Sequence, residues 1–423
     1  MRATTAFNKM LSLPGADVTG VHFDPGGIVV DLRRRARRLT CPCGWSTRAI
    51  YDQSVRTWRH LDLGASKLFL RAQIRRLHCR RCQRVRTEVV PWARPAARHT
   101  RDFEDVVAWL AQRVDKTTIT RLLRCSWEAV AAIVTRVVGD HIDDARLDEL
   151  YRIGVDDVSY RKGHRYLTVV ADHDREGRVV WVGEGRSAAT LEAFFDELGE
   201  ARTQQLQAIS ADMGAGYRKA ITNRAGHAEL CLDPFHVIQL ANNAVDRVRR
   251  SVWNELRRAG RTERGPLGRS TTRRPSPATQ LKRTRWAVLK DPADLTDDQR
   301  EALERLRRDR NVLYRAWELK ESLRDLYRLP DGAHADAHLD AWLARACRSR
   351  IPDMVRLSRT IREHREGVLA AITLGLSNSK LEGLASKVRL INHRGYGHHS
   401  AAAVIAMIYL SCGGITISLP TGR

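Results

Sequence analysis

Two aspartates stand where apolar, strand-like stretches end, and this position could give them metal chemistry. Asp156 lies in "IGVDDV", and Asp212 ends "LQAISAD", just before a segment with helical character. Carboxylates brought from separate strand ends to one edge of a sheet can bind a hard divalent cation, which prefers oxygen ligands. Each residue alone also has a simpler explanation, Asp212 as a helix N-cap and Asp156 as a turn residue. For either residue taken singly, the simpler explanation is favoured.

A third acid would have to reach the same edge, and the segment "GLSNSKLEGLASKVRL" offers Glu382. Helical spacing places Asn378, Glu382 and Ser386 along one flank of this helix, beside its apolar face. Ser379 and Glu382 also have the spacing of a capping box, which explains the glutamate without any metal. Both interpretations stay open on this segment alone.

Four cysteines form a second candidate metal site. Cys41 and Cys43 lie in "LTCPCGW", and Cys79 and Cys82 lie in "LHCRRCQRV". Two such knuckles separated by strands bring four thiolates to one tetrahedral zinc ion in zinc ribbons. The first knuckle is C-x-C, one residue shorter than the usual spacing, so unpaired thiols or a lost site remain alternatives, with His78 as a substitute ligand. The knuckles predict a structural zinc.

Arginines surround the second knuckle, and the chain as a whole is strongly basic. Its 423 residues carry a formal net charge of +24, which makes a polyanion the expected partner. The arginines beside the knuckle would offer a surface to phosphates, although such a run is more often a solvated face. They are Arg75, Arg76, Arg80, Arg81, Arg84 and Arg86.

The elements that must position these residues follow from hydrophobic patterning. Residues 1–95 alternate as short strands, beginning with a hairpin around "DPGG", and predict a zinc-ribbon-like β module. Residues 96–148 predict three short amphipathic helices, with Ser126 capping the third. This spacing is typical of a helix-turn-helix DNA-binding segment, and a plain three-helix bundle is an equal alternative.

The remainder predicts an α/β domain interrupted by helices. Residues 149–240 contain three successive strands (153–158, 166–172 and 179–184), followed by alternating helices and strands, which indicates a mixed sheet covered on both faces. Residues 241–370 predict an all-α insertion with a basic loop at 260–280. One long helix is predicted to begin at a capping box formed by Thr296 and Gln299. Residues 371–423 return to the sheet domain and supply the third acid.

One apolar segment approaches the length of a membrane span. Residues 401–419, "AAAVIAMIYLSCGGITISL", are interrupted by Ser411, the Gly413–Gly414 pair and Thr416. We interpret them as a buried helix followed by a strand, with no membrane association. The start of the sequence has no continuous apolar core of a signal peptide, so the expected location is cytoplasmic and reducing, which favours metal ligation over disulfides.

Several segments together resemble the DDE transposases of the ISL-three insertion-sequence family. They are "GVDDVSYRKGHRYLTVVAD", "SADMGAGYRKAI", "LDPFHVIQLANNAVDRVRR", "TRWAVLK" and "SNSKLEGLASKVRLINHRGYG", in this order, and the likeness spans nearly the whole chain, including the cysteine knuckles and the three helices. The resemblance implies an RNase H-like mixed sheet with a helical insertion before the last acid.

The resemblance also implies the roles of the acids. Asp156, Asp212 and Glu382 would be the metal-binding triad for two magnesium or manganese ions. Asp233 and His236, in "DPFH", would lie near the site, as would Asn378. Asp157 would point away from the metals by strand alternation, next to Arg161, Lys162 or Arg165.

The implied reaction is hydrolysis at the ends of the insertion sequence, then attack of the freed 3′-hydroxyl on target DNA. The expected partners are the element ends and the target, bound by a homodimer or larger assembly at the nucleoid. A non-catalytic DNA-binding regulator and a plain RNase H-like nuclease or resolvase are the alternatives. The regulator would leave the sheet with its acids unexplained, and the nuclease would have less use for a separate DNA-reading module.

Overall fold

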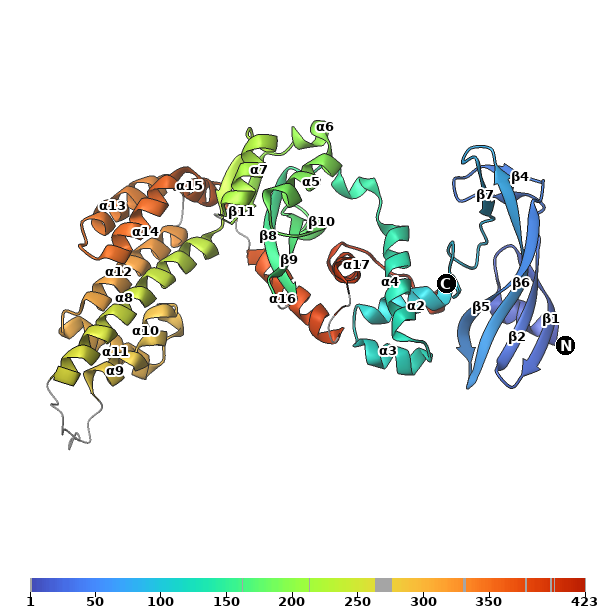
Figure 1. The fold of residues 1–423 in the computed structure, drawn as a ribbon, viewed down its shortest axis with the longest axis horizontal. Helices are drawn as coiled ribbons and strands as arrows, with labels where there is room; N and C mark the ends of the chain where they lie inside the picture. Colours follow the sequence, from blue (N-terminus) through green and yellow to red (C-terminus); the bar gives the residue numbers. More distant parts are fainter. Residues whose placement is uncertain are drawn as a thin grey trace. The chain divides into compact units, whose positions relative to one another are not determined.

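A computed structural model describes residues 2–161, 163–212, 214–262, 276–329, 332–376, 379–395, 398 and 400–422 (Figure 1). Contacts between residues divide the chain into two compact units. The first unit comprises Met1–Arg146, Tyr160–His164 and Ser386–Arg423, and the second comprises Leu147–Ser159 and Arg165–Ala385.

The first unit begins with a β module. Its helix and strands are α1 (Ala3–Leu11), β1 (Ala16–Asp24), β2 (Gly27–Arg34), β3 (Leu39–Thr40), β4 (Ser46–Thr47), β5 (Asp52–Leu63), β6 (Ser66–Cys79) and β7 (Arg84–Thr87). The main sheet has the order β1-β2-β6-β5, with β7 paired to β6, while β3 and β4 form a separate two-stranded sheet. Gly27 starts β2 with φ +136°, and a Cβ there would lie 2.3 Å from the Lys67 carbonyl oxygen. The hairpin predicted around this turn is confirmed.

Three helices follow the β module, as the sequence predicts: α2 (Arg101–Ala111), α3 (Lys116–Leu123) and α4 (Trp127–His141). Each helix has a side-chain N-cap, supplied by Thr100, Asp115 and Ser126. These caps accept backbone N–H groups that the first helical turn leaves without a partner. The local sequence therefore fixes where all three helices begin.

The C-terminal helix α17 (Ala401–Cys412) packs against α4 within the same unit. The Gln112 side-chain amide donates hydrogen bonds to the carbonyl oxygens of Leu410 (2.7 Å) and Ile415 (3.2 Å). The prediction of a strand after this helix is wrong, because residues 413–419 form no strand and a 3₁₀ turn follows at Pro420–Gly422. These residues carry Gly413 and Gly414, whose flexibility disfavours regular extended structure.

The 3₁₀ turn Asp144–Leu147 spans the point where the chain passes from the first unit to the second, which holds a five-stranded mixed sheet. Its elements are β8 (Arg152–Arg161), β9 (Arg165–Asp172), β10 (Arg178–Glu184), α5 (Ala188–Leu198), α6 (Glu200–Thr203), β11 (Ala208–Ala211), α7 (Ala215–Ala225) and β12 (Glu229–Leu232). The strand order is β10-β9-β8-β11-β12. Strand β11 runs parallel to both β8 and β12, whereas β9 and β10 form an antiparallel pair. The predicted mixed sheet is confirmed in these residues.

Helices cover both faces of this sheet. Ile153, Val155 and Ile209 pack with buried residues of α5 and α7 on one face. On the other face, Ala208 and Cys231 pack with the helix α15 (Arg365–Thr373). Alternate residues of each strand therefore enter two different cores, as strand geometry requires.

Residues from Pro234 to Thr373 are helical wherever they form regular structure in the described part. The helices are α8 (Pro234–Thr262), α9 (Pro277–Arg283), α10 (Arg285–Leu289), α11 (Asp297–Arg308), α12 (Val312–Asp325), α13 (Ala335–Cys347), α14 (Pro352–Glu363) and α15, with 3₁₀ turns at Pro292–Asp294, Leu326–Arg328 and Gly332–His334. They share one hydrophobic core, in which the long α8 contacts α12 and α14 (Figure 1). Helix α16 (Ser379–Arg394) follows this block.

The single long helix predicted after Thr296 is wrong. The chain leaves helical geometry at Arg310, where φ is +50°, and Asn311 caps the new helix α12. The cause is local: a left-handed residue ends one helix and an asparagine oxygen begins the next. The capping box of Thr296 and Gln299 is confirmed. Most of the expected basic loop, residues 263–275, lies outside the described residues.

Candidate functional site

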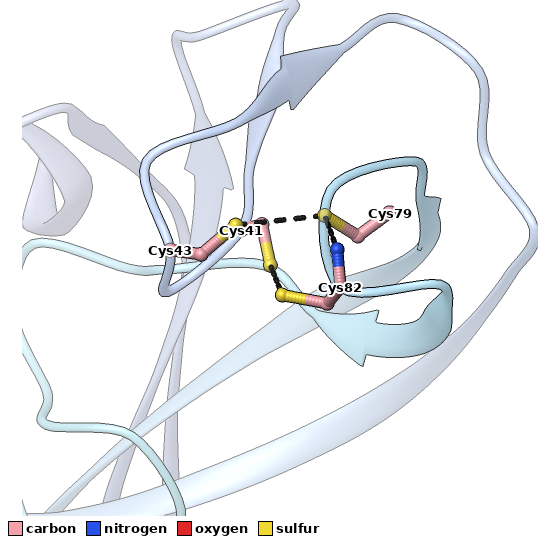
Figure 2. Close-up of side chains that lie close together, drawn as sticks. All are labelled: Cys41, Cys43, Cys79 and Cys82. Atoms are coloured by element: carbon pink, nitrogen blue, oxygen red, sulfur yellow. Dashed lines mark hydrogen bonds between the residues drawn. The ribbon is translucent and has the colours of Figure 1, made fainter.

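The four knuckle cysteines come together at one end of the β module (Figure 2). Their Sγ atoms all lie within 4.8 Å of one another. The Cys41–Cys82 and Cys43–Cys79 sulfur distances are 3.9 and 3.5 Å. Four thiolates about 2.3 Å from one tetrahedral zinc would lie roughly 3.8 Å apart, so the spacing fits this metal.

The short first knuckle closes through backbone hydrogen bonds. Cys41 N–H donates to the Trp45 carbonyl oxygen (2.8 Å), and Gly44 N–H donates to the Cys41 carbonyl oxygen (2.9 Å). Gly44 has φ +89°, a conformation open to glycine at little cost. The C-x-C spacing therefore does not prevent four-cysteine ligation. His78 is exposed and lies outside the cluster, so no substitute ligand is needed.

The thiols differ in how readily they lose a proton in the absence of metal. Burial raises the pKa of Cys41 to about 12. The backbone hydrogen bond from Trp45 lowers the pKa of Cys43 to about 6. A zinc ion binds thiolates, so its charge would have to offset the burial cost at Cys41.

The second candidate site lies at the carboxyl ends of β11 and β12, beside the middle of β8, which continues past Asp156 to Arg161. Pairing places Ser210 beside Gly154 and Ala211 beside Leu232. Continuing this register sets Asp212 beside Asp156 on one side. On its other side it lies beside Asp233, whose N–H donates to the Ala211 carbonyl oxygen (3.3 Å). Three aspartates thus stand at one level on three neighbouring strands.

Strand alternation assigns these acids to faces of the sheet. Asp156, Asp212 and Asp233 follow the residues that face α15, and Asp157 follows the residues that face α5 and α7. Burial raises the pKa of Asp156 to about 6, and the negative charges of Asp157 and Asp233 add to this rise. The backbone N–H of Asp157 donates to Asp156 Oδ1 (2.8 Å) and opposes it. A carboxylate in such surroundings is stabilised by a bound cation.

The adjacent Asp157 has its own surroundings. Burial raises its pKa, and the positive charge of Arg186 lowers it. Arg186 is exposed and stacks on the Tyr166 ring, 4.1 Å from its centroid. Of the partners expected for Asp157, Lys162 lies outside the described residues. Arg186 was not anticipated, although its position two residues beyond the strand Arg178–Glu184 was a usable signal, because β10 ends at the same edge as β8.

His236 brings a positive charge to the acids. Its Nδ1 lies 2.9 Å from Asp233 Oδ2. This hydrogen bond, with the charges of Asp212 and Asp156, raises the pKa of His236 to about 9. The imidazole is therefore protonated at neutral pH, and the spacing D-x-x-H at the start of α8 sets the contact.

The third predicted acid, Glu382, belongs to helix α16. Its side chain and Asn378 lie outside what the structure describes. The sheet edge therefore brings together Asp156, Asp157, Asp212, Asp233 and His236. Assignment of Glu382 to this edge stays a prediction.

The three-helix segment is tied to the β module by buried charges. Arg94 is buried and donates to Asp105 Oδ1 (2.7 Å) and Asp140 Oδ2 (2.9 Å). Glu104, also buried, accepts from Arg136 (2.7 Å). The Arg94 pairs join the β module to α2 and α4, and the Arg136 pair joins α4 to α2.

Three family models match the chain. Residues 153–408 match a model described as transposase, residues 88–138 a helix-turn-helix domain of transposase family ISL3, and residues 40–82 a zinc-finger of transposase IS204/IS1001/IS1096/IS1165. The zinc-finger match covers the four-cysteine cluster and supports a structural zinc there. The helix-turn-helix match covers α2 and α3 and most of α4.

Two relatives match most of the chain. The transposase for insertion sequence element IS1557 of Mycobacterium tuberculosis is 40% identical over 398 residues, which is 92% of this chain and 87% of the relative. The transposase for insertion sequence element IS1001 of Bordetella parapertussis is 26% identical over 379 residues, 89% of each chain.

A zinc-binding module, a helix-turn-helix and an α/β domain with acids at one sheet edge define a DNA-binding, DNA-cleaving enzyme of the transposase class. The chain belongs to the ISL3 family of DDE transposases. Within the described residues, no helix has the length and apolar character needed to cross a membrane.

Proposed function

We propose that this transposase binds the ends of its insertion sequence and performs divalent-cation-dependent strand cleavage and transfer. Asp156, Asp212 and Glu382 would hold two magnesium or manganese ions. The observation that supports this most is the register of β8, β11 and β12, which sets Asp156 and Asp212 side by side. Oxygen ligands at one sheet edge match the preference of these cations.

The donor set fits a divalent cation. Asp156 and Asp157 are partly buried among further acids, and burial raises the pKa of both carboxyl groups. Repulsion between these negative charges is relieved either by protonation of the carboxylates or by a bound cation. At neutral pH a cation relieves it while the carboxylates stay ionised. Bound divalent ions supply charge that activates water and stabilises the leaving oxygen in phosphodiester cleavage.

The proposed reaction has two displacements. In the first, a water oxygen attacks phosphorus at the element's end, the P–O3′ bond breaks, and a 3′-hydroxyl is left. In the second, this 3′-hydroxyl attacks a phosphorus in target DNA, and the target's own P–O3′ bond breaks. Neither step consumes a nucleotide cofactor, and neither needs a covalent bond to the protein.

The proposed domain organisation follows the sequence expectation. It comprises the zinc-ribbon-like module (1–95), the helix-turn-helix segment (96–148), an RNase H-like core (149–240 and 371–423) and a helical insertion with a basic loop (241–370). Contacts in the structure divide the last segment differently, because Ser386–Arg423 groups with Met1–Arg146 and not with the sheet. Two element ends must meet target DNA in one complex, so we propose a homodimer or larger assembly on DNA at the nucleoid.

The test is cleavage and joining on a supercoiled plasmid that carries the element's ends, with magnesium. We expect Asp212→Asn and Glu382→Gln each to lower cleavage by at least about a hundredfold, since each removes a ligand charge at similar size. DNA binding, measured in the same preparations, should persist. Glu366→Gln is the matched control, because Glu366 is exposed on α15 and lies outside the proposed ligand set.

The outcomes separate the two parts of the proposal. If Glu382→Gln cleaves at the wild-type rate and Asp212→Asn does not, Glu382 is a helix cap and the third ligand lies elsewhere. If both variants cleave like the wild type, the metal-triad mechanism is wrong.

A further inference from the structure

Charge is distributed very unevenly within the first unit. We define the knuckle pole as residues 36–48 and 74–87, the two segments that carry the zinc-binding cysteines. The knuckle pole contains nine arginines and no aspartate or glutamate. Residues 101–141, which form the three helices, contain six lysines and arginines and six acids. The helix-turn-helix is thus formally neutral, and the knuckle pole is strongly positive.

Most knuckle-pole arginines have no acidic partner. Arg75 pairs with Glu88 (2.8 Å), and Arg76 pairs with Asp52. The other seven arginines are exposed, and none forms an ion pair with any residue that the structure describes. They are Arg37, Arg38, Arg48, Arg80, Arg81, Arg84 and Arg86. The Arg81 guanidinium donates to the Cys43 carbonyl oxygen (3.1 Å).

The zinc site does not neutralise this charge. A zinc ion with four thiolates carries a net charge of about −2. Seven unpaired arginines therefore leave a clear positive excess around the metal. Like charges held this close on a folded module repel each other, and a polyanion relieves that repulsion.

Several arginines elsewhere in the unit have acidic partners. On the same β module, Arg35 pairs with Asp17 (2.8 Å) and Arg71 pairs with Asp31 (2.6 Å). On the helices, Arg101 pairs with Asp140 (2.8 Å). These guanidinium groups already have counter-charges, so they gain less from a phosphate than an unpaired arginine does.

We propose that the knuckle pole is the surface of this unit that binds DNA phosphates, and that it supplies most of the salt-dependent affinity. Arginine suits the task because its planar fork matches phosphate oxygens. The neutral helices would then contribute base contacts and little electrostatic attraction. This inference rests on the proposed DNA-binding function and assigns its electrostatic part to one surface.

The test compares two triple variants of the full chain. Arg80→Gln, Arg84→Gln and Arg86→Gln together remove three unpaired charges at the knuckle pole. Arg35→Gln, Arg71→Gln and Arg101→Gln together remove the same formal charge from ion-paired arginines outside the knuckle pole. Binding to a short duplex of unrelated sequence is measured over a range of salt concentrations, with zinc content and thermal unfolding recorded for each variant.

We expect the knuckle-pole variant to retain its zinc. The slope of log K against log salt concentration should become less steep by about 2–3, since each phosphate contact contributes roughly 0.9 to it. The control variant should keep a slope near that of the wild type. An unchanged slope in the zinc-loaded knuckle-pole variant, or an equal loss in both variants, would overturn the proposal. The proposed function would still hold if the knuckle-pole variant had an unchanged slope while the wild type bound element ends more tightly than unrelated DNA.

Discussion

At the scale of single residues, the cysteines show how an unusual spacing still gives a metal site. The C-x-C knuckle is closed by backbone hydrogen bonds around Gly44, so both sulfurs face the second knuckle. The aspartates behave differently, since their proximity depends on strand register. Candidate metal ligands thus reach their sites through a local turn in the case of the first knuckle and through strand register in the case of the aspartates.

Replacing one knuckle cysteine tests the zinc site. We expect Cys79→Ser to lose bound zinc and to make residues 40–87 sensitive to protease, because metal binding and folding are coupled in such modules. Cys125→Ser is the control, since Cys125 lies outside the cluster. Metal content per chain and limited proteolysis are the measurements. Full zinc retention in Cys79→Ser would show that Cys79 is not a ligand.

At the scale of elements, helix α15 packs on the face of the sheet to which the three in-register aspartates belong. Gly367, in its first turn, permits close packing on β12. A Cβ at this position would lie 2.8 Å from Leu232 Cγ and 3.0 Å from the Leu230 carbonyl oxygen. The approach of α15 to the strand that precedes Asp233 therefore depends on one glycine.

We expect Gly367→Ala to destabilise the second unit by about 1–3 kcal/mol, because overpacking forces α15 away from β12. Cleavage should slow as well, since β12 carries Asp233 into the site. Urea unfolding and the plasmid cleavage assay are the measurements. Gly139→Ala is the contrast, as open space surrounds that helical glycine and alanine favours a helix. Equal stability of the two variants would argue against the tight α15–β12 contact.

At the scale of the whole molecule, the buried acids link stability to pH and to metal. The pKa of Asp156 rises from 3.8 to about 6 on folding. A raised carboxyl pKa means that the folded state binds the proton more tightly than the unfolded state does. Protonation of Asp156 therefore stabilises the folded state, and this contribution is complete below about pH 4. That contribution is lost as the pH rises through 6.

For the metal-free protein we therefore expect the free energy of unfolding of the second unit to fall by up to about 3 kcal/mol between roughly pH 4 and pH 7, because of the Asp156 pKa shift. Asp156→Asn should flatten this dependence. Magnesium added to the wild type at pH 7 should recover stability, and the variant should respond less. An identical pH profile for the wild type and Asp156→Asn would refute this account of the site.

Much of the architecture could be predicted from local sequence. The hairpin at "DPGG", the caps Thr100, Asp115 and Ser126, and the strand end before Asp212 are read from neighbouring residues, because turns, caps and alternation are short-range. The strand end predicted at Asp156 is wrong, because β8 continues through this residue to Arg161. The cysteine knuckles belong to the same group. Local pattern failed at Arg310, where a left-handed residue divides the predicted long helix, and after Cys412, where no strand forms.

The amino-acid sequence by itself determined which residues could ligate metal, where most elements begin, and the basic character of the chain. Only the tertiary structure decided that Asp233 stands level with Asp156 and Asp212, that α17 packs on α4, and which arginines keep an unneutralised charge. The physical reason is distance along the chain. Strand register, helix docking and ion pairing join residues far apart in sequence, and their geometry is set by the packing of the whole fold.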